Sequence, residues 1–111
     1  MGLGGVELTM QKASDTAATT EANGALAPAV SGSALVLNSV LFSADVATVF
    51  KLVNGTTHDI IFGPVYLPAN GGLFVGPTAL DRVFRSTEGE GIDWDSTGDG
   101  NAAVQITYEV A

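Results

Sequence analysis

The sequence predicts an all-β protein: a single antiparallel β-sandwich or β-barrel-like domain that follows a flexible N-terminal arm. Two observations favour this fold class. Short runs of β-branched and aromatic residues alternate with a period of two, and clusters of Gly, Pro, Asn and Asp separate these runs. We therefore expect roughly seven to nine short strands and no helix longer than about two turns.

The clearest strand signal lies at residues 46–53, VATVFKLV, where both faces carry β-branched or aromatic side chains. Asn54-Gly55 follows directly, and this dipeptide is typical of two-residue type I′ hairpin turns. We expect residues 57–62 to return as the partner strand. Gly63-Pro64 should then break the strand, because proline has no N–H to donate to the ladder. Two more short strands are expected after this break, at residues 65–67 and 73–75.

The same alternation predicts the remaining strands in chain order. They are expected at residues 6–11, 34–42, 92–95 and 102–110, with a strand or an irregular edge at residues 80–84. In the last of these strands, Val104, Ile106, Tyr108 and Val110 alternate with smaller or polar residues. This pattern indicates one buried face and one face in contact with water.

Residues 13–33 have a different composition, rich in Ala, Ser, Thr, Gly and Asn, with few side chains that would anchor a core. We interpret them as a mobile arm or a long surface loop, or as an arm that orders only against a neighbouring subunit. The expected organisation is thus an N-terminal strand and arm over residues 1–33, followed by a β-sandwich domain over residues 34–111.

The charge and the residue composition exclude several kinds of partner and site. The 111 residues include only four cations against twelve carboxylates, a formal net charge of −8, and no cysteine. An acidic surface repels phosphate backbones and anionic membranes, so we expect neither nucleic acid nor membrane as a partner. The absence of cysteine excludes disulfides and thiolate metal sites. No stretch reaches the roughly 18 apolar residues of a membrane-spanning helix.

The most metal-like string is Asp93-Trp-Asp95-Ser-Thr-Gly-Asp99, which imitates the start of an EF-hand calcium loop. The last ligand position of such a loop needs a bidentate glutamate, and Val104 occupies it here. The flanking segments also look like strands and not helices. We therefore predict a metal-free hairpin turn, with Asp93, Asp95 and Asp99 as the candidates for a looser calcium site.

We expect no catalytic residue and no cofactor, and hence no enzyme. His58 is the only histidine, and no serine lies in a nucleophile-elbow context beside it. Glu88 and Glu90 could pair as glycosidase carboxylates do, but their glycine-rich surroundings favour a solvated turn.

Trp94 shares a strand face with Ile92, which favours burial in the core. The alternative is an exposed aromatic platform for sugars, built from Trp94, Tyr66 or Tyr108. Arg82 and Arg85 are expected to pair with carboxylates, within the chain or across an interface. The candidate interface residues are therefore Arg82, Arg85 and Trp94.

Residues 54–111 resemble the small virion-associated β-sandwich proteins of tailed bacteriophages. The strings that carry the resemblance are FKLVNGTT, which begins just before this range, then LPANGG, GPTAL, EGEGIDW and GNAAVQITYEV. The resemblance implies a non-enzymatic structural protein of the virion that assembles as a symmetric oligomer. The role that we favour from this resemblance is that of a capsid decoration (cement) protein. Such a protein would be a homotrimer on the capsid exterior that binds and stabilises the lattice of the major capsid protein.

Three alternatives to decoration remain open. A head–tail connector or tail accessory protein would share the same fold, and a carbohydrate-binding module belongs to a different functional class. A calcium-dependent adhesion domain belongs to another class again, and it would need Asp93, Asp95 and Asp99 to converge. The charge is compatible with the lead interpretation, because an acidic protein stays soluble on its own and does not bind the packaged genome.

Overall fold

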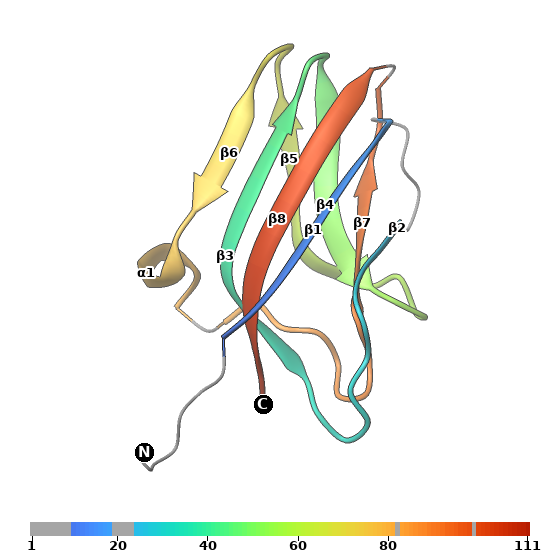
Figure 1. Ribbon diagram of the computed structural model, residues 1–111, viewed down its shortest axis with the longest axis vertical. Coiled ribbons are helices and arrows are strands. Elements are labelled where there is room, and N and C mark those ends of the chain that lie inside the picture. Colours follow the sequence, from blue (N-terminus) through green and yellow to red (C-terminus); the bar gives the residue numbers. More distant parts are fainter. Residues whose placement is uncertain (1–9, 19–23, 82, 99) are drawn as a thin grey trace.

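A computed structural model describes residues 10–18, 24–81, 83–98 and 100–111 of the chain. It confirms the β-sandwich: eight strands form two four-stranded antiparallel sheets that pack against each other (Figure 1). Within the described ranges the one helix, α1 (Pro77–Leu80), has four residues, in agreement with the expected absence of long helices. No helix in these ranges is long and apolar enough to cross a membrane.

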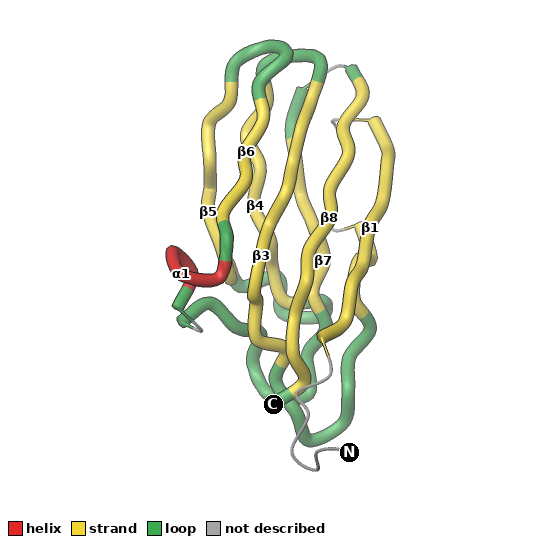
Figure 2. The backbone as a smooth tube through the Cα atoms, turned by 60° about the vertical axis from the view of Figure 1, so that its left-hand side comes forward, coloured by secondary structure: helices red, strands yellow, loops and turns green. Residues whose placement is uncertain are grey.

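The order of strands is simple in both sheets. The first sheet runs β1 (Met10–Ala18), β8 (Asn101–Val110), β3 (Leu35–Ala44) and β6 (Gly72–Val75). The second sheet runs β2 (Gly24–Ala27), β7 (Ile92–Ser96), β4 (Thr48–Asn54) and β5 (Ile60–Leu67). The connections β3–β4 and β5–β6 lie at the end of the sandwich opposite to the C-terminus (Figure 2).

The core lies between the sheets and is centred on three aromatic rings. Phe42 of β3 stacks on Phe50 of β4 with centroids 4.1 Å apart, and Trp94 of β7 meets Phe42 edge-on at 6.2 Å. All three side chains are fully buried, which confirms the predicted burial of Trp94. On β8 the predicted inward residues Val104, Ile106 and Tyr108 are also buried, whereas Val110 at the strand end is exposed.

The predicted two-residue turn at Asn54-Gly55 is wrong. Neither residue has a positive φ, and the left-handed residue of this connection is His58, with φ 63°. The backbone N–H of Asn54 donates to the carbonyl of Asp59 at 2.9 Å, so the loop spans residues 55–59. Asn54 is buried, and its side-chain amide donates to Thr57 and to Thr87. A tertiary role for Asn54 thus overrides its local turn preference.

The predicted break at Gly63-Pro64 is also wrong, because β5 continues through it. Phe50 faces Val65 and Leu52 faces Phe62, so Gly63 and Pro64 together oppose the single residue Lys51. β5 is an edge strand, where a bulge and a proline are tolerated. Gly63 has φ 96°, and a Cβ there would lie 2.8 Å from the carbonyl oxygen of Phe50. Only glycine fits this bulge without strain.

The described residues of the range 80–84 do not form a strand. Pro77 starts α1, and Asp81 ends it in the left-handed conformation with φ 48°. The return to the first sheet is irregular, with a single bridge between Val36 and Arg85. Proline at the first turn of a helix has a φ suited to that position, which explains why the turn signal at Gly76-Pro77 begins a short helix.

Two strands lie in the range expected as a flexible arm. β1 pairs with β8 from Met10↔Glu109 to Ala18↔Asn101, and β2 pairs with β7. The strand expected at residues 6–11 is described from Met10 onward, and residues 6–9 lie outside the described part. The mobility expected of residues 13–33, and the division of the chain at residue 33, stay predictions.

Asp45, in the loop before β4, is hydrogen-bonded to Asn101 at the start of β8. Its carboxylate accepts hydrogen bonds from the backbone N–H of Asn101 at 2.7 Å and from the Asn101 amide at 3.3 Å. The first of these bonds is the main reason that the pKa of Asp45 is lowered from its ordinary value of 3.8.

Because this pKa is lowered on folding, Asp45 stabilises the fold above about pH 4 and loses that effect as the pH falls through its folded-state pKa. Asp45→Asn keeps the size and one acceptor but removes the charge. We expect its melting temperature to be below that of the wild type at pH 7, with the difference shrinking towards pH 3. Thermal melts followed by circular dichroism at several pH values test this, and an equal difference at pH 7 and pH 3 would argue against the charge.

Candidate functional site

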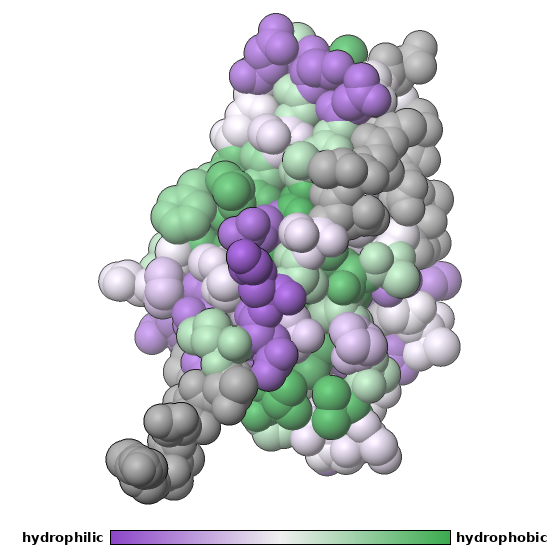
Figure 3. All heavy atoms as spheres, viewed as in Figure 1, coloured by the Kyte–Doolittle hydropathy of each residue, from purple (hydrophilic) through white to green (hydrophobic). Residues whose placement is uncertain are grey.

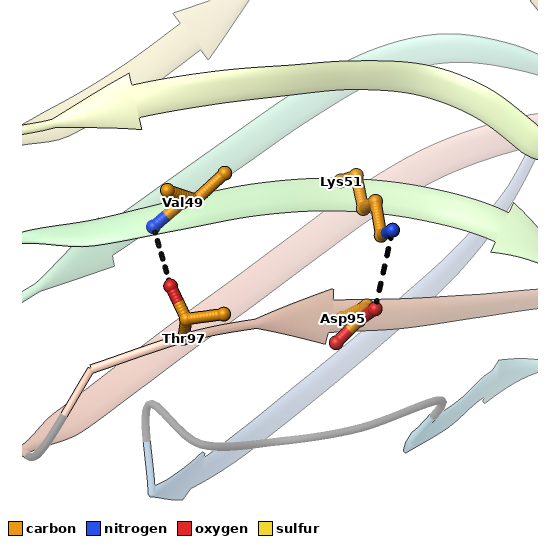
Figure 4. A network of polar contacts seen from close by, with 4 residues as sticks. All are labelled: Val49, Lys51, Asp95 and Thr97. Carbon is orange, nitrogen blue, oxygen red and sulfur yellow. Dashed lines mark hydrogen bonds and ion pairs between the residues drawn. The ribbon is translucent and has the colours of Figure 1, made fainter.

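A shallow hollow lies on the outer face of the second sheet, where three strands contribute side chains. It is lined by Val49 and Lys51 of β4, Asp95 and Thr97 from and just after β7, and Ile60, Pro64 and Tyr66 of β5. Figure 4 shows how its floor links β4 to β7. The outward positions follow from the alternation of β4, whose inward residues Phe50 and Leu52 belong to the core.

The floor of the hollow is polar and internally paired. Lys51 and Asp95 are direct cross-strand partners, and Nζ lies 3.6 Å from Oδ2 (Figure 4). The backbone N–H of Val49 donates to Oγ1 of Thr97 at 3.3 Å, and that of Thr97 donates to the Val49 carbonyl at 3.1 Å. A half-exposed ion pair of this kind adds little stability, on the order of 0–1 kcal/mol. Because the charges of Lys51 and Asp95 cancel, the floor of the hollow has almost no net charge.

The rim of the hollow is apolar and exposed. Tyr66 is 75% exposed and Ile60 is 53% exposed, and Pro64 lies between them in the strand. Tyrosine is enriched at binding interfaces, because its ring buries a large area while its hydroxyl hydrogen-bonds. The arrangement is suited to binding a surface.

Sequence reasoning did not single out this hollow. Tyr66 was weighed only as one of three possible sugar-binding aromatics. Trp94 and Tyr108 are buried, so they form no exposed platform, and Tyr66 alone remains. One feature of the sequence indicates that Tyr66 points outward. In the run Val65-Tyr66-Leu67 the two aliphatic residues face the core, so the aromatic residue between them faces the other way.

The predicted metal candidates are only partly brought together. Asp93 and Asp95 both project from the outer face of β7, and Asp95 is paired with Lys51. Partial burial raises the pKa of Asp93 above its ordinary value. Among the described residues no group of three His, Cys, Asp or Glu side chains is placed to hold a metal ion. Asp99 lies outside the described residues, so the absence of metal from this loop stays a prediction.

The predicted interface residues have different environments. Trp94 is fully buried and therefore contributes to the core, where it offers no surface contact. Arg85 is exposed, and its backbone bridges to Val36 at the edge of the first sheet. Arg82 lies outside the described residues. A contact between Arg85 and another molecule stays a prediction.

The two glutamates of the 86–91 loop have different environments. Glu90 accepts hydrogen bonds from the hydroxyl and from the backbone N–H of Thr56, and these bonds lower its pKa. The backbone N–H of Gly55 also donates to the carbonyl of Gly91 at 3.1 Å. Glu90 thus joins the two loops at this end of the sandwich, whereas Glu88 is exposed.

Comparison with known proteins gives a fold match only. No family model matches the chain, and no curated protein is similar to it in sequence. The fold is similar to that of a chain in the acid-stable capsid structure of Helicobacter pylori bacteriophage KHP30, with a TM-score of 0.58. The two sequences are 11% identical, and the match covers 96% of this chain and 94% of that chain. The two chains are therefore of nearly the same length and share one architecture.

Proposed function

We propose that this protein is a non-enzymatic structural component of a bacteriophage virion, and specifically a capsid decoration protein that binds the lattice of the major capsid protein. The observation that carries the proposal is the fold match over nearly the whole of both chains, because the other chain is part of a phage capsid structure. At 11% identity this likeness is one of fold, so the role itself is the step that we propose.

The described surface is consistent with such a role. A decoration protein needs a stable scaffold and an exposed contact surface, and it needs no reaction centre. The hollow beside Tyr66 provides a partly apolar contact surface with a nearly neutral floor. We assign this surface to the contact with the shell protein, with Tyr66 and Ile60 as its central side chains.

Two other functions predict different behaviour. A head–tail connector or tail accessory protein would bind at one vertex or along the tail, and not across the shell. A carbohydrate-binding module would use Tyr66 as its stacking aromatic, the one candidate of the three that is exposed. The homotrimer and the position on the capsid exterior belong to the decoration proposal.

Co-sedimentation with capsids that lack this chain tests the proposal. We expect the purified protein to saturate such capsids, and Tyr66→Ala to weaken binding by at least about tenfold, the effect of losing an interface anchor worth more than about 1.4 kcal/mol. Val83→Ala is the matched control, since Val83 is also highly exposed but lies away from the hollow. Failure of the wild type to bind would refute the decoration role, and glycan binding lost in Tyr66→Ala would favour the carbohydrate-binding module.

A further inference from the structure

The outer face of the first sheet carries a second apolar surface. Phe74 of β6 and Leu41 of β3 are direct cross-strand partners, 68% and 45% exposed. Figure 3 shows the apolar surface over β6 and β3 on this side of the molecule. Two large apolar side chains that meet on an open sheet face are a typical feature of interaction sites.

The surroundings of this pair are almost free of charge. The register places Gln105 opposite Leu41, and Thr107 opposite Ser39 and Lys12. The hydroxyls of Ser39 and Thr107 are hydrogen-bonded to each other. Among the described outward side chains of this face, Lys12 is the exposed charged one, and the carboxylate of Glu109 is buried. No exposed carboxylate lies on this face among the residues whose side chains the structure describes.

The exposed acidic side chains that the structure describes lie elsewhere. Asp93 and Asp95 are on the opposite face, on β7, and Asp45 is in the loop before β4. Asp59, Asp81, Glu88 and Glu90 are in the loops between strands. The chain carries a net charge of −8, so two copies repel wherever their carboxylates would meet. Among the described side chains, the outer face of the first sheet therefore presents no exposed carboxylate to a second copy, and this lowers the repulsion between two copies there.

We propose that the outer face of the β1-β8-β3-β6 sheet, centred on Leu41 and Phe74, is the contact between copies of this protein. The distribution of the described carboxylates favours a second copy as the occupant, because a face without exposed carboxylates lowers the repulsion that opposes self-association of a chain of net charge −8. Two arrangements keep the carboxylates of two copies apart. In one, two of these faces pack on each other about a two-fold axis. In the other, this face packs against the flank of a neighbour in a ring. The inference does not depend on the proposed capsid role.

Sedimentation velocity of the full chain tests this contact. The double variant Leu41→Asp, Phe74→Asp places two carboxylates on the face, and both side chains are exposed, so its fold should persist. We expect the wild type to sediment as an oligomer and the double variant as a folded monomer, with a dissociation constant raised at least about 100-fold. Tyr66→Asp is the matched control, an exposed aromatic residue on the opposite face, and it should assemble as the wild type does.

Two results would overturn the proposal: a wild type that is monomeric at high concentration, or a double variant that assembles like the wild type. Circular dichroism checks that the double variant is folded. If the two aspartates prevent folding, Phe74→Ser is used in place of the double variant. Capsid co-sedimentation of the monomeric variant keeps the two proposals apart. A variant that self-associates normally but no longer binds capsids would mean that this face contacts the shell instead, and would also refute the self-contact.

Discussion

Trp94→Ala is expected to lower the free energy of unfolding by about 3–5 kcal/mol, a large part of the stability of a domain of this size. Trp94 is fully buried in β7, and its ring meets Phe42, which in turn stacks on Phe50. Truncation would remove the central contact between the two sheets and leave a cavity that the surrounding strands cannot close. Urea denaturation followed by circular dichroism measures the loss.

Tyr66→Ala is the matched control for this experiment. It also removes an aromatic ring from a strand of the second sheet, but that ring is 75% exposed. We expect a change within about 0.5 kcal/mol, as for most exposed positions. Equal destabilisation by the two substitutions would contradict the placement of Trp94 at the centre of the core.

Gly91→Ala is expected to destabilise the fold by about 1–3 kcal/mol, although it adds only one methyl group. A Cβ at this position would collide with the carbonyl oxygen of Ala27, and would lie 2.9 Å from the nitrogen of Ala29. Both contacts are with the backbone of the segment that leaves β2, and a backbone cannot rotate away as a side chain can. Thermal melts and urea denaturation measure the effect.

Gly55→Ala serves as the control for Gly91→Ala. Gly55 is hydrogen-bonded to Gly91, but a Cβ there would have its nearest neighbour at 3.5 Å, an ordinary van der Waals contact. We expect this variant to be as stable as the wild type or slightly more stable, because alanine restricts the unfolded chain. Similar losses in both variants would show that general loop disturbance, and not the close approach at Gly91, is responsible.

Strands with strong alternation could be predicted from the sequence. The predicted strands at residues 34–42, 92–95 and 102–110 correspond to β3, β7 and β8, and every predicted end lies within two residues of the observed one. In these segments the period-two pattern reflects burial between two sheets, which is the force that forms them. For the same reason the fold class was predicted correctly.

Other elements depend on tertiary contacts that leave little trace in the local sequence. β1 consists mostly of small and polar residues and pairs with β8 from Asn101 to Glu109. The turn after Asn54 is set by its side-chain bonds to Thr57 and Thr87, the second of which is 33 residues away. Propensity alone therefore predicted an arm and a two-residue turn in these places.

The candidate site was beyond sequence analysis for a related reason. The hollow combines side chains from three strands, and their alignment depends on the two-residue bulge at Gly63-Pro64. The sequence alone predicted that β5 stops at this point, which would have separated Ile60 from Tyr66. The apolar face around Leu41 and Phe74 likewise requires the order of the strands, since its residues come from β1, β8, β3 and β6.

Quantitative mass spectrometry of gradient-purified phage particles, from the phage or prophage whose genome encodes this chain, tests the capsid role most directly. The decoration role predicts many copies per particle, in a constant ratio to the major capsid protein that persists through repeated purification. A copy number that is small beside that of the shell protein would point to the head–tail or tail alternative. Absence of the chain from intact particles, while it is abundant in the same lysate, would contradict a structural role in the virion.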